Sequence, residues 1–239
     1  GLSWMLNVRL PFNFNSPYRA INISDFWRRW HMSLSQFLRD YLYIGLGGNR
    51  KGVVRRYANL MVTMVLGGLW HGAGWSFVIW GTLHGLYLGI NHGFRALCGP
   101  GLCARFDRSR LFGASSWLLT MLAVILAWVV FRAETLRGAG RILERMVHPA
   151  HTGHVHTLLW NAGLSLSVGG LWCVVLGAMA CLMPNSNAIG EHLLRRCQSR
   201  SGATAYALLI AGASSAAVAF LLLMNITRDS VSAFIYFNF

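Results

Sequence analysis

Two histidines lie where their chemistry could be used inside an apolar environment. The segment 57–94 contains no Asp, Glu, Lys or Arg, yet His71 stands in its middle, within the motif WHGAGW (70–75). Burying an imidazole in hydrocarbon is costly unless its nitrogens find partners, so an ionisable residue at membrane depth indicates a functional site. A neutral imidazole in such a place can act as a general base that accepts a proton from a hydroxyl. The alternative is a structural histidine that bonds a neighbouring helix.

The second histidine, His31, directly follows the aromatic and basic motif FWRRW (26–30). If this segment is helical, Ser35 lies one turn further along the same face. His31 could then orient a reactant, or it could be an interfacial histidine with a hydrated tip. The residues alone leave its role open.

The remaining histidines do not form a recognisable metal site. His84 and His92 follow without an intervening carboxylate, and neither an HExxH motif nor a Cys/His ligand spacing occurs. A crowded set in a short polar loop could bind a surface metal weakly, but an ordinary loop is the simpler explanation: His148, His151, His154 and His156. We therefore expect neither a metal nor a bound cofactor.

The composition indicates that membrane helices position these residues. Hydrophobic residues make up 55% of the 239 residues and charged residues only 12%, which is too apolar for an ordinary soluble domain. Tracts without charge occur at 57–94, 111–131, 157–190 and 201–227. Each has at least the roughly 20 residues that a helix needs to cross a bilayer. The fold class expected is all-α, a polytopic membrane helix bundle.

The distribution of charge indicates the orientation of this bundle. A net charge of +14 would suggest nucleic acid in a soluble protein, but here the Arg residues fall almost entirely between the apolar tracts. The segment 9–56 holds eight Arg and the only Lys, so we predict that it faces the cytoplasm and meets anionic lipid or an acidic partner. Its GGNRKG turn (47–52) lacks the Ser or Thr that follows Lys in a P-loop. We expect no nucleic-acid partner.

Local signals predict the elements near the histidines. Residues 7–22 should form a loop, after which Ser24 caps a helix over 25–44 that lies in the membrane interface or slants into the bundle. Glycines on both sides of His71 predict a break or re-entrant turn there, next to a cavity, because non-helical backbone at membrane depth needs protein or water around it. A basic amphipathic helix is expected over 133–146.

The cysteines and the first residue say little about the site. The five Cys contain no CxxC pair, so no disulfide framework is indicated, and Cys98 and Cys103 could bridge only if their loop were periplasmic. The chain begins with Gly1 and carries no cleavable signal, so we expect it to be the later part of a longer protein.

Longer motifs give the chain a resemblance to a known family. The two that carry it are FNSPYRAINISDFWRRWHMSLSQFLRDYLYIGLGGNRKG (14–52) and NLMVTMVLGGLWHGAGWSFVIWGTLHGLYLGI (59–90), supported by FRAETLRGAGRILERM, MPNSN and AFIYFNF further along. They resemble the membrane-bound O-acyltransferase (MBOAT) family, and within it the alginate O-acetyltransferase branch. The resemblance implies interfacial and re-entrant helices around a central tunnel. It also implies that residues 1–239 are the C-terminal part of a single transmembrane domain whose N-terminal helices are absent.

The same resemblance implies a function. By this resemblance the protein would be a multi-pass enzyme of the bacterial inner membrane. It would move an acetyl group from a cytoplasmic thioester, acetyl-CoA, toward an exported polysaccharide such as alginate. A periplasmic acetyltransferase-like partner and the polysaccharide synthesis and export machinery would complete the transfer. The membrane-embedded histidine of the family falls on His71 in WHG, and its second characteristic histidine falls on His31 in WRRWH.

The expected mechanism gives each of these residues a role. His71 would take the proton of an acceptor hydroxyl as that oxygen attacks the thioester, and His31 would position a reactant or stabilise charge. Trp70 and Trp75 would shape the pocket and exclude water, although interfacial anchoring explains them almost as well. The cations expected to attract coenzyme phosphates, unless they only meet lipid, are Arg28, Arg29, Arg50 and Lys51.

Two other classes of function remain open on the sequence. The protein could load D-alanine or another acyl group from a carrier protein onto a cell-envelope polymer. It could also be a non-catalytic channel or scaffold for a periplasmic acetyltransferase, and that class predicts activity without His71.

Overall fold

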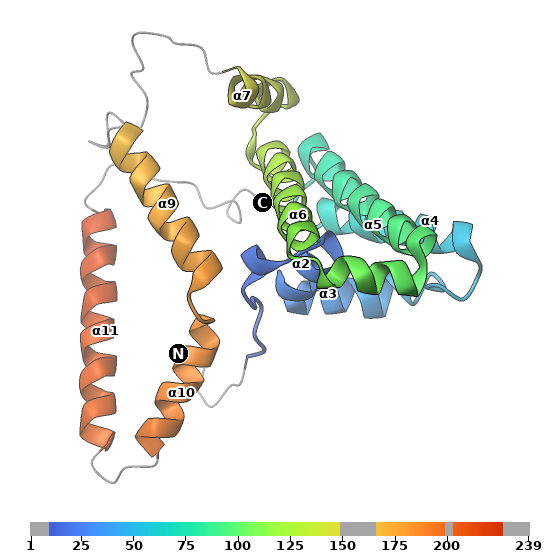
Figure 1. The fold of residues 1–239 in the computed structure, drawn as a ribbon. Helices are drawn as coiled ribbons and strands as arrows, with labels where there is room; N and C mark the ends of the chain where they lie inside the picture. The colour runs from blue at the N-terminus through green and yellow to red at the C-terminus, as the bar shows by residue number, and fades with distance from the viewer. Residues whose placement is uncertain (1–9, 149–165, 199–202, 227–239) are drawn as a thin grey trace. The chain divides into compact units, whose positions relative to one another are not determined.

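The computed structural model describes residues 10–148, 166–198 and 203–226, and every regular element in these ranges is a helix. The chain divides into two compact units, Gly1–Met183 and Pro184–Phe239. Figure 1 shows the helices with the labels used below. The all-α prediction is confirmed for the described residues, whereas the complete bundle and its central tunnel stay predictions.

The N-terminal part of the first unit consists of short helices. A 3₁₀ turn, η1 (Pro17–Arg19), precedes α2 (Ile23–Arg29), α3 (Met32–Phe37) and the π-helical segment η2 (Leu38–Tyr43). The continuous helix predicted over 25–44 is therefore wrong. His31 interrupts it with a left-handed backbone, φ 44° and ψ 55°.

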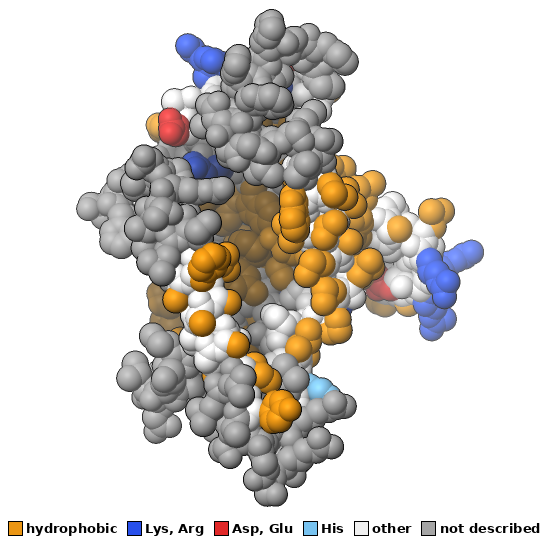
Figure 2. Space-filling view, turned by 90° about the vertical axis from the view of Figure 1, so that its left-hand side faces the viewer, with side chains coloured by type: hydrophobic (Ala, Val, Ile, Leu, Met, Phe, Trp, Pro, Cys, Tyr) orange, Lys and Arg blue, Asp and Glu red, His pale blue; other side chains and the backbone are white. Residues whose placement is uncertain are grey.

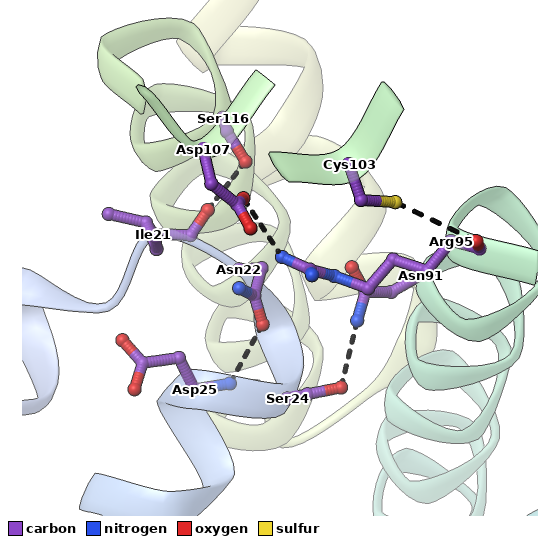
Figure 3. Close-up of polar contacts among 9 residues, drawn as sticks. All are labelled: Ile21, Asn22, Ser24, Asp25, Asn91, Arg95, Cys103, Asp107 and Ser116. Carbon is purple, nitrogen blue, oxygen red and sulfur yellow. Dashed lines mark hydrogen bonds and ion pairs between the residues drawn. The ribbon is translucent and has the colours of Figure 1, made fainter. Parts of the chain in front are cut away.

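Polar contacts fasten the start of α2 to the helices behind it (Figure 3). Asn22, and not the predicted Ser24, caps this helix, because its side chain accepts a hydrogen bond from the Asp25 backbone N–H at 2.9 Å. Ser24 instead accepts a bond from the Asn91 amide at 2.8 Å. These two bonds fix where α2 begins relative to the helix that carries Asn91.

The next two helices form a tightly packed hairpin. They are α4 (Val53–Leu69) and α5 (Trp75–Arg108), and the five residues between them make the break that the glycines predicted around His71. A side chain at Gly81 would meet the backbone oxygen of Met64, and one at Gly68 would meet that of Phe77. The hairpin packs this closely because glycine lets two helix backbones approach each other.

The second half of α5 bends away before the next helix. Gly99, with φ 67°, and Pro100 interrupt the helix, and an ion pair of 3.3 Å between Arg95 and Asp107 spans the bend (Figures 1 and 3). Cys98 and Cys103 lie in this region as free thiols.

Helix α6 (Arg110–Arg132) has one buried and one exposed face. Thr120, Val124 and Ala127 face the core, while Leu118 and Leu122 on the other side are about half exposed. By length and composition, α6 is the one described helix that could cross a bilayer alone, and the count rises to two if α9 and α10 are taken together. Figure 2 shows hydrophobic side chains over much of the described surface in view, with Lys and Arg gathered away from them.

The remaining helices follow the apolar pattern of the sequence. The basic amphipathic helix expected over 133–146 is present as α7 (Leu136–Val147), capped by the Thr135 side chain. The first unit ends with α9 (Leu166–Leu182), and the second unit contains α10 (Ser186–Gln198) packed on α11 (Ala203–Ile226). His151, His154 and His156 lie outside the described residues.

Aromatic side chains dominate the core of the first unit. Phe26 and Trp27 from α2 pack with Met64 of α4, Trp80 of α5 and Val124 of α6. Because α4, α5, α6 and α2 meet here, the core fixes the position of α2 and thus of His31, two residues after its end.

Candidate active site

His71 lies in the break between α4 and α5. Its backbone N–H still donates to the Gly68 carbonyl at 3.0 Å, as in the last turn of a helix. The chain then turns at Gly72, whose φ is 149°. A side chain at Gly72 would come within 2.6 Å of the Phe77 ring, so only glycine fits.

Four aromatic rings surround the imidazole of His71. The ring centroids of Trp70, Phe131 and Trp80 lie 5.0, 5.1 and 5.4 Å away, each nearly perpendicular to the imidazole, and that of Phe77 lies at 6.4 Å. Among the described residues, no hydrogen bond or ion pair engages the imidazole itself. The half-buried ring is therefore held by packing alone, and its nitrogens are available to a reactant.

His31 lies at the junction of α2 and α3. Its carbonyl accepts the Ser35 N–H at 2.9 Å, while Asn13 binds the following residues, since its carbonyl accepts the Met32 N–H and its side chain accepts the Ser33 N–H. His31 Nδ1 is buried and has no hydrogen-bond partner among the described residues. A left-handed non-glycine backbone and an unpartnered buried nitrogen are both typical of functional positions.

Trp70 brings the two histidines to one place. Its indole lies 5.0 Å from the His71 ring and 6.2 Å from the His31 ring, measured between centroids. The indole is 52% exposed, so the region around both imidazoles is open on one side. The two histidines that the sequence singled out are thus neighbours of the same side chain.

The other predicted site residues do not touch either imidazole. Trp75 is 74% exposed at the start of α5, and Arg29 is paired with Asp25 at 2.9 Å. Arg28, Arg50 and Lys51 are exposed. Their roles toward a donor or toward lipid stay predictions.

A cavity of about 360 Å³ lies among α2, α3, η2, α4 and α5, and neither His31 nor His71 lines it. It is therefore not the cavity predicted beside His71. Polar and charged side chains surround one part of it: Ser35, Arg39, Asn49, Arg56 and His92. The cavity continues to Thr63 and Met64, two turns of α4 before His71.

The two arginines of this cavity differ in their electrostatic surroundings. Arg39 is bonded to Asp40 at 2.7 Å, and this bond lowers the pKa of the Asp40 carboxyl, which stays ionised at neutral pH and offsets the arginine charge. Arg56 has no ion pair in the described part of the chain and lies 5.5 Å from the centre of the Tyr57 ring. Arg56 is thus the cation of the cavity whose charge is not neutralised.

Local sequence patterns do not indicate that two of these positions belong to one site. Arg56 and His92 come from different helices, and their joint place on one cavity depends on the packing of α4 against α5. His84 was considered only as a metal ligand, yet it is wholly buried and bonded to Trp27. Its position four residues after Trp80 was the one signal that it shares a helix face with the surroundings of His71.

The amino-acid sequence of this region matches a family model. Residues 5–131, which include both histidines and the whole hairpin, match the membrane-bound O-acyltransferase family. The chain belongs to the membrane-bound O-acyltransferase family. The resemblance seen in the sequence motifs is therefore confirmed.

Relatives within the family act on several polymers. The chain is 48% identical over 147 residues to a peptidoglycan O-acetyltransferase of Helicobacter pylori, covering 62% of this chain and 27% of the relative. It is 47% identical over 146 residues to a probable alginate O-acetylase of Pseudomonas aeruginosa, covering 61% and 26%. With a teichoic acid D-alanyltransferase of Bacillus subtilis it shares 35% identity over 95 residues, or 37% of this chain and 24% of the relative. The chain thus spans about a quarter of the length of these members of the family.

Proposed function

We propose that the protein is a membrane O-acyltransferase that moves an acetyl group from a cytoplasmic thioester, acetyl-CoA, to a hydroxyl on the route to a cell-envelope polysaccharide. The observation that carries the proposal is the meeting of His71 and His31 at Trp70. Family membership and two O-acetylating relatives at 47–48% identity support the choice of acetyl over other acyl groups.

In this reaction His71 is the general base. Its ring nitrogen accepts the proton of the hydroxyl as the hydroxyl oxygen bonds to the carbonyl carbon of the thioester. The carbon–sulfur bond then breaks, and the leaving sulfur takes the proton back from the imidazolium. The aromatic cage around His71, formed by Trp70, Phe77, Trp80 and Phe131, favours this role because it holds the imidazole without a competing hydrogen bond.

His31 is the positioning partner in the same proposal. Its buried Nδ1 has no hydrogen-bond partner among the described residues, and its ring stands across Trp70 from the base. A reactant oxygen at the open edge of Trp70 would lie within reach of both imidazoles. His31 would then orient the reactant while His71 moves the proton.

The cavity lined by Arg56 supports a place for the donor. An anionic phosphate fits an unpaired arginine next to His92 and Asn49, and the remainder of the cavity extends along α4 toward the break. In this proposal the phosphates of the coenzyme stay at the basic end, while the thioester passes on toward His71.

The cellular setting follows the charge pattern. In this proposal the donor side faces the cytoplasm, which the basic segment 9–56 supports, and the protein crosses the bacterial inner membrane several times. A periplasmic acetyltransferase and the synthesis machinery of the polymer are the partners proposed. The polymer is alginate, peptidoglycan or another envelope glycan.

A second candidate is the transfer of D-alanine from a carrier protein, which the relationship to a teichoic acid D-alanyltransferase favours. The chemistry at His71 would be the same, and only the donor would differ. To distinguish the two donors, membranes that contain the protein are given either labelled acetyl-CoA or a labelled D-alanyl carrier protein. The label that enters the polymer identifies the donor.

The replacement His71→Asn tests the proposed chemistry. In the full-length membrane protein we expect polymer acetylation to fall about 10²- to 10⁴-fold, because general base assistance of this kind contributes that much. Acetylation is measured with labelled acetyl-CoA at matched abundance in the membrane. His148→Asn, an exposed histidine after α7, is the matched control and should keep normal activity. Near-normal acetylation by His71→Asn would reject the general base.

A further inference from the structure

We propose that His84 is a positioning residue that holds both proposed catalytic histidines in place through two tryptophans. The inference rests on the roles proposed above for His71 and His31. His84 touches neither of them by ring contact or hydrogen bond among the described residues, so it does not meet the reacting atoms. Its influence passes through Trp27 and Trp80.

His84 is a polar residue buried in the aromatic core. Its side chain is 0% exposed, in the middle of α5 and surrounded by rings. The Trp80 and Trp27 centroids lie 4.7 and 5.3 Å from its own, and the Phe26 ring is stacked on it at 6.3 Å. An apolar side chain of similar size would fill this space without burying a polar group, so the imidazole is expected to serve through its hydrogen bond.

That bond joins two helices far apart in the sequence. The Trp27 indole N–H donates to His84 Nδ1 at 3.3 Å, which ties the last turn of α2 to α5. The bond requires an unprotonated Nδ1, so the imidazole is neutral and carries its proton on Nε2. His31 follows Trp27 by four residues, so the end of α2 that leads into its left-handed turn is fixed by this bond.

The second route runs along α5 to the break. Trp80 is 4% exposed, and it lies one helical turn before His84. Its ring stands between two imidazoles, 4.7 Å from that of His84 and 5.4 Å from that of His71. The His84 ring therefore supports the indole that forms one wall of the cage around His71.

The two routes predict a loss of rate and not of donor binding. If the end of α2 and the Trp80 wall shift, the two histidines lose their mutual geometry, and a displacement of about 1 Å is enough to lower turnover about 10²-fold. Trp27 lines the cavity proposed for the donor, but His84 does not, and the cation proposed to bind the donor phosphates is Arg56, so the affinity for the donor should be kept.

The test compares two replacements of His84 in the full-length membrane protein. His84→Leu fills the space but cannot accept the indole hydrogen bond, whereas His84→Asn offers a side-chain oxygen near the position of Nδ1. We expect His84→Leu to lower kcat about 10- to 100-fold with the KM for acetyl-CoA within about twofold of the native value. His84→Asn should recover most of the loss.

Trp27→Phe changes the other partner of the hydrogen bond and completes a double-mutant cycle with the His84 variants. It removes the donor but keeps an aromatic ring, and in its background His84→Asn and His84→Leu should have the same kcat. The midpoints of the pH–rate profile should be equal in all variants, because a residue that only positions others carries no proton in the reaction. Native kcat in His84→Leu, no recovery by His84→Asn, or a shifted midpoint would each overturn the proposal.

Two further results keep the test decisive. If His84→Leu fails to accumulate in the membrane, Trp27→Phe decides alone, and a native kcat in that variant overturns the proposal. His71→Asn is assayed in parallel. Its normal activity would reject the proposed function, whereas an inactive His71→Asn together with a fully active His84→Leu rejects only the role of His84.

Discussion

At the scale of the residue, the cage around His71 depends on one glycine. The chain leaves α4 and enters α5 within a few residues, and Gly72 makes this turn with a φ of 149° that side chains rarely adopt. Phe77, one of the four rings around the imidazole, packs directly on Gly72. Backbone conformation and aromatic packing are thus coupled at the position of the proposed base.

The replacement Gly72→Ala tests this coupling. The new methyl group would stand 2.6 Å from the Phe77 ring on a strained backbone, at a cost of about 1–3 kcal/mol, so we expect a lower melting temperature and reduced turnover. Thermal unfolding and acetyl transfer are measured on the detergent-solubilised protein. Gly140→Ala is the control, because nothing lies within 4 Å of that position on the exposed side of α7. If the two variants behave alike, the turn does not depend on Gly72.

At the scale of the element, local signals predicted some helix ends and missed others. The break at His71 was predictable because glycines flank it, and α6 was predictable because its apolar tract lies between two arginines. The break at His31 was not, since FWRRWHMSLS has helical spacing throughout and the left-handed turn is fixed by Asn13, eighteen positions earlier. Where the local pattern does not indicate a helix end, contacts between segments distant in the sequence determine its position.

The cavity lined by Arg56 also depends on how the helices pack and not on any sequence motif. Five helical segments contribute to its lining, so no single stretch of sequence could indicate it. The cations predicted to meet the donor cluster along the chain, whereas the structure brings Arg56 of α4 and His92 of α5 together on one cavity. Spatial proximity of this kind needs the packed hairpin.

The replacement Arg56→Gln tests the donor end of the cavity. Removing the unpaired charge of Arg56 should raise the KM for acetyl-CoA several-fold. The kcat should change little, because Arg56 and His71 lie at opposite ends of α4. Initial rates over a range of acetyl-CoA concentrations give both constants. Arg55→Gln, an exposed neighbour that does not line the cavity, should leave the KM unchanged. A donor KM that is equal in both variants would contradict this assignment.

At the scale of the whole molecule, charge and helix length define an orientation. Arg55 and Arg56 stand at the start of α4, and Arg105 and Arg108 at the end of α5, so we predict that both ends of the hairpin face the cytoplasm. Helix α6 begins at that side and, with its 23 residues, is long enough to reach the other. In this predicted orientation, residues 53–132 form a hairpin followed by one crossing.

Cysteine labelling tests this orientation. In an otherwise cysteine-free protein, Arg50→Cys should react with a membrane-impermeant maleimide only from the cytoplasmic face, and Glu134→Cys, just after α6, only from the opposite face. Right-side-out and inverted vesicles supply the two faces. Reaction of both positions from the same side would mean that α6 does not cross.

The length of α4 has a consequence for the kind of donor that can serve. Its 17 residues extend about 25 Å, close to the hydrocarbon thickness, and Phe131, which packs on His71, belongs to the last turn of α6. In the predicted orientation the imidazole of His71 stands deep in the bilayer, toward the periplasmic leaflet. An acyl group must hang from a long, slender tether to arrive there, and thioesters of short thiols, lacking that reach, should be poor donors even when their carbonyls are equally reactive.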